Sequence, residues 1–189
     1  MTAVIEVNQA QINDVMAMLN GIEKDAVLAL RRSINRTATG AKTLIAKELG
    51  KTMTLKSSRI KKNMVVNKAA GTKLSAVVTL KGTSIRAIDF TNRPLQSGVS
   101  IKKWKSKKPQ KFKHAFYANI GNRYGIFTRA EVSPNMFAGR IPTVELLGPP
   151  ITLAYEKTPG LSNQVETESA DRLLREMDAQ VNFILSKYD

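Results

Sequence analysis

Apolar residues in the first third of the chain recur with the spacing of amphipathic helices. Over 12–19 they fall at i, i+3, i+4 and i+7, which predicts a first short helix. A longer stripe predicts a long helix that ends near Gly50, and its members are Ile22, Ala26, Leu30, Ile34, Ala38, Ala41, Ile45 and Leu49. Gly40 lies within this stripe and is expected to weaken the helix by up to about 1 kcal/mol relative to alanine. A shorter basic helix over 55–62 completes a helical N-terminal part, residues 1–62.

After residue 62 the pattern changes to period two, which is typical of β-strands. Gly121-Asn122-Arg123 is expected to close a hairpin. The predicted strands cover 64–69, 74–80, 85–90, 99–104, 112–120 and 124–129. They assign residues 63–130 to an antiparallel sheet.

A Pro/Gly-rich loop is expected over 131–160, followed by a C-terminal helix over 161–189. Asn163 and Glu166 have the spacing of a capping box at the start of that helix. Together these segments predict an α+β fold, in which the antiparallel sheet has the long N-terminal helix and the C-terminal helix packed against it. The length of 189 residues fits a single domain.

The positive charge is concentrated in the middle third of the chain. Residues 51–114 carry 17 basic side chains and one acidic side chain, Asp89, whereas the chain as a whole has a net charge of +15. The flanking segments, 1–50 and 115–189, have net charges of +1 and −2. Such a field favours phosphate backbones or acidic protein surfaces as neighbours.

The densest part of this charge is a basic arm, residues 98–114. It contains seven lysines without an acidic residue, namely Lys102, Lys103, Lys105, Lys107, Lys108, Lys111 and Lys113. Three interpretations stay open: a solvated arm, an arm that faces DNA phosphates, or an arm that docks onto an acidic partner ring. Lysine without arginine argues against reading of base edges. Trp104 is expected to be an amphipathic anchor rather than a base-stacking platform.

Residues for catalysis and cofactor binding are scarce. The chain has one histidine, His114, and no cysteine, and His114 lies far in sequence from any carboxylate. Nucleophilic catalysis and metal binding need several such groups together, so we expect no enzyme, no catalytic residue, no metal and no cofactor. The sequence has no run of 18 apolar residues and no signal-peptide pattern, so no membrane partner is expected.

Four blocks of sequence resemble the phage minor tail protein Z family, also called tail-completion proteins. The first is Ala29–Ala38, with Asn-Arg-Thr-Ala at its end, and the second is Leu55–Ala69. The third is Ala87–Phe90. The fourth and most specific runs from Ala115 to Pro150 and includes Gly125-Ile126-Phe127-Thr128-Arg129, Arg140-Ile141-Pro142 and Leu146-Leu147-Gly148-Pro149-Pro150.

The resemblance covers about residue 29 to the C-terminus, with two departures. Leu147 and Pro150 stand where an aromatic residue and a serine are more usual, and the arm is more basic than the family pattern. The resemblance implies one tail-completion domain over 1–189. It also implies a homo-oligomer, a hexameric ring at the head-proximal end of a phage tail, with double-stranded DNA passing through its lumen.

The implied location is the tail or neck of the virion, after assembly in the bacterial cytoplasm beside other tail and neck proteins. The signature residues expected to serve assembly are Arg129, Arg140, Pro142, Gly148 and Pro149. The Gly-Pro-Pro turn is expected to position the final helix, and Arg129 and Arg140 either to clasp this turn or to bond across a subunit boundary. The alternatives are a head-side connector or tail terminator of similar fold, or a DNA-binding protein without sequence preference.

Overall fold

A computed structural model describes residues 2–6, 9–18, 23–71, 73–129 and 142–187. Helices and antiparallel sheets are both present, so the predicted α+β class is confirmed. The chain divides into two compact units. Unit 1 comprises Met1–Lys47, Lys61–Lys81 and Pro159–Asp189, and unit 2 comprises Glu48–Ile60 and Gly82–Thr158. The single tail-completion domain stays a prediction.

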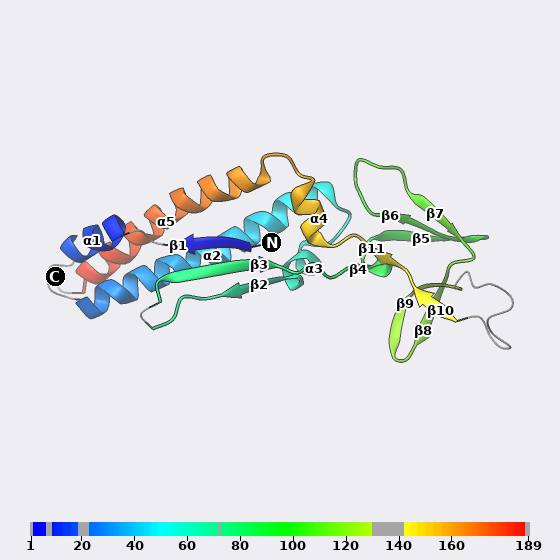
Figure 1. Cartoon of the computed structure of the whole chain (residues 1–189), viewed down its shortest axis with the longest axis horizontal. Coiled ribbons are helices and arrows are strands. Elements are labelled where there is room, and N and C mark those ends of the chain that lie inside the picture. Colours follow the sequence, from blue (N-terminus) through cyan, green and yellow to red (C-terminus); the bar gives the residue numbers. More distant parts are fainter. Residues whose placement is uncertain (1, 7–8, 19–22, 72, 130–141, 188–189) are drawn as a thin grey trace. The chain divides into compact units, whose positions relative to one another are not determined.

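Unit 1 contains long helices and a three-stranded antiparallel sheet of order β1-β3-β2. Its strands are β1 (Thr2–Glu6), β2 (Met64–Asn67) and β3 (Ser75–Leu80), and its helices are α1 (Gln9–Met18), most of α2 (Glu23–Thr52) and α5 (Leu161–Leu185). Figure 1 shows α2 and α5 running side by side along the strands. Each long helix is expected from its apolar stripe, and the C-terminal helix ends within the predicted range.

The core of unit 1 is formed by side chains that are buried at regular intervals along its helices and strands. Along α2 the buried side chains recur at helical spacing, in the order Ala26, Leu30, Ile34, Ala38, Ala41 and Ile45. Along β3 every second residue is buried, namely Ala76, Val78 and Leu80. The apolar face of α5 consists of Leu161, Val165, Leu173, Met177, Val181 and Ile184. These faces form one core between the helices and the sheet.

Unit 2 is built from short strands. They are β4 (Ile85–Arg86), β5 (Thr91–Leu95), β6 (Gly98–Lys102), β7 (Gln110–Lys113), β8 (Phe116–Ile120), β9 (Arg123–Arg129), β10 (Thr143–Glu145) and β11 (Leu147–Gly148). They pair antiparallel in three groups, β5-β6-β7, β10-β9-β8 and β11-β4. The helical elements are the 3₁₀ turn η1 (Ala87–Asp89), α4 (Ile151–Glu156) and most of α3 (Ser57–Lys62). The predicted sheet over 63–130 is therefore several small sheets.

Four local expectations for unit 2 differ from the structure. The strand predicted over 85–90 ends at Arg86 and is followed by η1. The strand predicted over 112–120 is two strands, because His114 has a φ of 59° and turns the chain between β7 and β8. The segment 91–95 is a strand that was not predicted. The range 131–160, expected to be a loop, contains β10, β11 and α4. The predicted hairpin at Gly121-Asn122 is present, with positive φ at both residues, as its tight turn requires.

Candidate functional site

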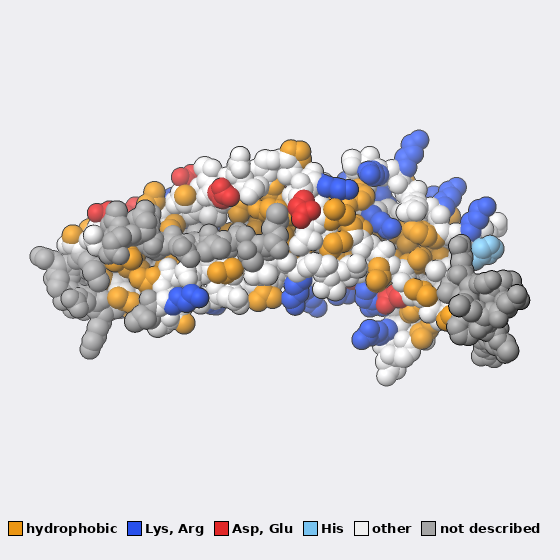
Figure 2. All heavy atoms as spheres, viewed as in Figure 1, with side chains coloured by type: hydrophobic (Ala, Val, Ile, Leu, Met, Phe, Trp, Pro, Cys, Tyr) orange, Lys and Arg blue, Asp and Glu red, His pale blue; other side chains and the backbone are white. Residues whose placement is uncertain are grey.

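The basic arm forms two strands and the loop between them. β6 pairs with β7 over Gly98↔Lys113 to Ile101↔Gln110, and β5 pairs along the other edge of β6. Figure 2 shows lysine and arginine side chains projecting from the region of β6 and β7. Five of the seven arm lysines are exposed, and Lys102 and Lys103 are half-buried. The arm is therefore an ordered part of a sheet.

The strand register places cations on one face of this sheet. Ser100 is buried, and its two cross-strand neighbours are Arg93 in β5 and Lys111 in β7. Because side chains at i and i+2 share a face, Lys102 and Lys113 belong to the same face. We call Arg93, Lys102, Lys111 and Lys113 the basic sheet face. Arg93 was not predicted, because only the pairing of β5 with β6 brings it beside the lysines.

The loop between β6 and β7 is fastened to the end of α2 by main-chain hydrogen bonds. The Thr54 amide donates to the Lys103 carbonyl at 3.2 Å, and the Lys105 amide donates to the Thr52 carbonyl at 2.9 Å. Met53 and Trp104 form a β-bridge between these two bonds. One backbone hydrogen bond on each side of the bridge fixes the position of the loop, so the main chain that carries its lysines is held in place.

Trp104 lies between two hollows in unit 2. The first, about 430 Å³, is lined by Lys103, Lys107 and Lys108 of the arm together with Gly148 and Pro149 of the signature. The second, about 340 Å³, shares Trp104, Lys107 and Lys157 with the first and adds Lys51 and Ser106. We call the lining of both hollows the Trp104 surface; its other members are Thr52, Ile101, Gln110, Leu147, Leu153 and Thr158.

The Trp104 surface brings together two sets of residues that the sequence singles out separately, the basic arm and the Gly-Pro signature. Gly148 lies in β11, paired with Ile85, and the ring of Phe90 occupies the space where a Cβ on Gly148 would be. Pro150 then takes the N-cap position of the short helix α4. The Gly-Pro-Pro segment therefore leads into α4, and its expected role in positioning the final helix stays a prediction.

The other signature residues lie elsewhere. Arg129 is exposed at the end of β9, opposite Thr143, and Pro142 is exposed just before β10. Arg140 lies outside the described residues. Within the described part of unit 2, no hydrogen bond joins the Arg129 side chain to the Gly148–Pro150 segment. The expected clasp by Arg129 is therefore absent there.

A different arginine fastens this part of the chain. Arg86 in β4 forms an ion pair with Glu145 in β10 and donates to the carbonyl of Tyr124 in β9. The arrangement depends on Gly125, since a Cβ there would lie 2.7 Å from Oε1 of Glu145 and 2.9 Å from Nη2 of Arg86. No local sequence pattern signals this pair, because the two residues are 59 positions apart.

Reactive groups in unit 2 are few. His114 is exposed at the turn after β7, and its amide donates to the Ser97 carbonyl at 2.9 Å. Burial is the larger cause, and the neighbouring Tyr124 the smaller, that raises the pKa of the Tyr117 hydroxyl above its ordinary value of 10.0. That hydroxyl donates to Oδ1 of Asn92 at 2.8 Å. In the ranges that the structure describes, no three His, Asp or Glu residues lie close enough to hold a metal ion. The absence of enzymatic activity stays a prediction.

Comparisons with protein families, with curated proteins and with solved structures find no match for this chain. Among the helices described, none is long and apolar enough to cross a membrane. What the site can do therefore follows from its residues. It offers a tryptophan and leucines surrounded by lysines, next to a separate sheet face that carries four cations.

Proposed function

We propose that this chain is a structural protein of a tailed bacteriophage. It forms a homo-oligomeric ring of six copies at the head-proximal end of the tail, with DNA passing through the lumen. The observation that carries this proposal is the Trp104 surface, where the basic arm and the Gly148-Pro149 signature line one hollow. The signature carries the resemblance to tail-completion proteins, and the arm carries the strongest charge of the chain.

The composition of the Trp104 surface suits docking to another protein. Aromatic and aliphatic anchors surrounded by charged groups are common at protein interfaces, because the anchors supply affinity and the charges supply orientation and speed. Here Trp104 is half-buried and Leu147 is 51% exposed, with Lys103, Lys107 and Lys108 beside them. A contact of this kind that repeats head to tail forms a ring when its rotation closes on itself, and an open filament when it does not.

A charge-removal experiment tests the docking role. Lys103, Lys107, Lys108 and Lys157 are changed together to Gln, and the oligomeric state is measured by analytical ultracentrifugation. A matched control removes four exposed charges from unit 1, by changing Lys47, Lys62, Lys73 and Lys81 to Gln. We expect the first variant to lose the ring, and to fail to rescue particle assembly in a phage that lacks its own copy of this gene. The control should keep both properties. Equal assembly by both variants would contradict the proposal.

A second function is favoured by the basic sheet face. Arg93, Lys102, Lys111 and Lys113 can contact DNA phosphates without reading sequence. The corresponding variant changes these four residues to Gln. If the chain is a DNA-binding protein outside the virion, the wild type stays monomeric and binds duplex DNA with a steep salt dependence. In the variant the slope of that dependence then falls by about 0.9 for each phosphate that is no longer neutralised. Under the ring proposal the same variant still assembles.

Two neighbouring positions in the virion remain as alternatives to tail completion, a head-side connector and a tail terminator. Averaged electron images of particles labelled at this protein locate it on the head side or the tail side of the joint. A label at the distal end of the tail would contradict all three positions.

A further inference from the structure

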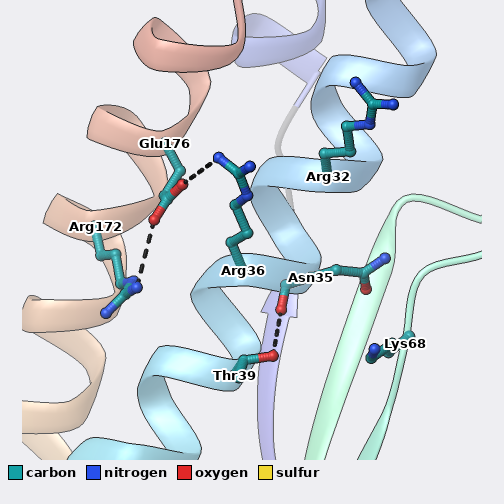
Figure 3. A pocket seen from close by; sticks show the side chains of 7 residues that line it. All are labelled: Arg32, Asn35, Arg36, Thr39, Lys68, Arg172 and Glu176. Carbon is teal, nitrogen blue, oxygen red and sulfur yellow. Dashed lines mark hydrogen bonds and ion pairs between the residues drawn. The ribbon is translucent and has the colours of Figure 1, made fainter.

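Unit 1 contains a basic hollow that is separate from the Trp104 surface and from the basic sheet face. It has a volume of about 540 Å³ and lies between α2, α5 and the segment that follows β2 (Figure 3). We call it the arginine pocket, and its lining residues are Arg32, Asn35, Arg36, Thr39, Lys68, Arg172 and Glu176. Four of them are cationic and one is acidic, so the lining has a net charge of +3.

The walls of the arginine pocket are held by hydrogen bonds between its segments. The Asn35 side chain donates to the Ala69 carbonyl at 3.1 Å and accepts from the Ala69 amide at 2.8 Å. This pair of bonds fixes the segment that carries Lys68. On the other side, the Ser33 hydroxyl lies 3.0 Å from the carbonyl oxygen of Glu176, which joins α2 to α5. The cations therefore project from a fixed frame.

One carboxylate forms ion pairs with two of the arginines. Glu176 lies between Arg36 and Arg172, with a nitrogen of each guanidinium 3.4 Å from one of its oxygens (Figure 3). A guanidinium has five N–H donors, so most donors of both arginines stay available. Within the described residues, neither Arg32 nor Lys68 forms an ion pair. Cations gathered in this way repel one another, and a bound anion relieves the repulsion.

The position of Arg172 depends on a missing side chain. A Cβ on Gly40 would lie 2.5 Å from the central carbon of the Arg172 guanidinium and 2.6 Å from Nε. The guanidinium therefore rests directly against α2 at Gly40. The helical pattern of the sequence identifies this glycine only as a weak point of the helix. The structure shows that it makes room for a cationic side chain in the pocket.

From this arrangement we infer that the arginine pocket binds a phosphate group. The cations come from α2, from the segment after β2 and from α5, so they can contact an anion from several directions. A tetrahedral phosphate offers oxygens in several directions, whereas a planar carboxylate matches a single guanidinium fork. The phosphate can belong to a DNA backbone or be free inorganic phosphate. The inference does not rest on the proposed ring, because no residue of the arginine pocket belongs to the Trp104 surface.

The test measures binding at the pocket itself. The Nε–Hε signals of the arginines in the full chain are followed by NMR while inorganic phosphate, or separately a short DNA duplex, is added. We expect saturable shifts of the Arg32 and Arg172 signals. Arg32→Gln should weaken phosphate binding about two- to fivefold, as for loss of one exposed charge contact. Lys47→Gln removes an equal charge from α2 outside the pocket and should leave the affinity unchanged.

Gly40→Ala distinguishes binding at a defined pocket from binding to a general patch of positive charge, because it changes the shape of the pocket and leaves the net charge unchanged. The added methyl group displaces the Arg172 guanidinium, and we expect a loss of about two- to fivefold while the helix keeps its circular dichroism. Wild-type affinity in both Gly40→Ala and Arg32→Gln, or pocket signals that do not respond, would overturn the inference. If DNA is the source, duplex shifts the pocket signals. If free phosphate is the source, duplex leaves them unchanged and only inorganic phosphate shifts them.

Discussion

Arg86 and Glu145 form an ion pair that connects two of the small sheets of unit 2. Arg86 lies in β4, which pairs with β11, while Glu145 lies in β10, which pairs with β9. Their side chains are 33% and 21% exposed, so water screens the pair only in part. Since β4, β10 and β11 have only two or three residues each, their ladder bonds are few. The ion pair therefore adds a side-chain connection to the main-chain bonds of Leu146, which accepts from the Ala87 amide and donates to the Ile126 carbonyl.

Glu145→Gln should destabilise the protein by about 1 kcal/mol, because a partly screened ion pair is replaced by a neutral hydrogen bond. The measurement is the free energy of unfolding in urea. Glu156→Gln removes an exposed carboxylate from α4 and should stay within about 0.5 kcal/mol of the wild type. Equal effects of the two substitutions would show that the pair does not stabilise the fold.

The clamp between Asn35 and Ala69 gives a second prediction. Asn35→Ala removes both hydrogen bonds and leaves two backbone groups of Ala69 without this partner. We expect a loss of about 2 kcal/mol, which lowers the Tm by roughly 4–8 °C. Asn182→Ala on the exposed side of α5 makes the same chemical change without these bonds and should leave the Tm unchanged or slightly higher. A wild-type Tm for Asn35→Ala would contradict the clamp.

His114 turns the chain with a φ of 59°, which glycine and asparagine tolerate better than branched residues do. His114→Gly and His114→Asn should therefore match or exceed the stability of the wild type. His114→Val should lose about 1–2 kcal/mol. Thermal unfolding of the three variants checks this order. If valine is tolerated as well as glycine, the turn does not hold this residue in the left-handed region.

The Tyr117 hydroxyl makes stability depend on alkaline pH. Its pKa is raised in the folded state, so folding favours the neutral form. The corresponding stability is fully present below the unfolded pKa of about 10 and is lost as the pH rises through the folded pKa. Tyr117→Phe loses the hydrogen bond to Asn92 but cannot ionise. Urea unfolding between pH 8 and pH 11, roughly spanning that range, should show a shallower alkaline loss in the variant. The same loss in both proteins would contradict this role.

Periodic burial made the helices predictable, whereas pairing between distant segments did not show in the sequence. The stripe from Ala26 to Ile45 repeats with helical spacing, so the face of α2 was identified correctly. The predicted range of the C-terminal helix begins at residue 161, where α5 begins, but the predicted cap was wrong, because Gly160 occupies the N-cap position and Asn163 lies inside the helix. The spacing of a capping box alone does not identify the capping residue.

Some elements of unit 2 were not predicted, for identifiable reasons. β5 contains Pro94 and few apolar residues, and such a strand is tolerated because it pairs on one edge only, with β6. Proline-rich sequence suggested a loop before α5, yet Pro150 suits the start of α4, where a missing N–H is not needed. The lysines of the arm were visible in the sequence. The positions of Arg93 and Trp104 beside these lysines were not visible, because they depend on the register of β5 with β6 and on the β-bridge between Met53 and Trp104.

The loop of the arm is held by main-chain atoms at Thr52, Thr54, Lys103 and Lys105. Hydrogen bonds of this kind are available to every residue type except proline at the donor positions. Side chains at 103, 105, 107 and 108 can therefore change identity over generations while the loop keeps its path. Related chains can raise, lower or reverse the charge of this surface and so follow a partner that is itself changing. The path of this loop and the charge that it carries can therefore evolve independently of each other.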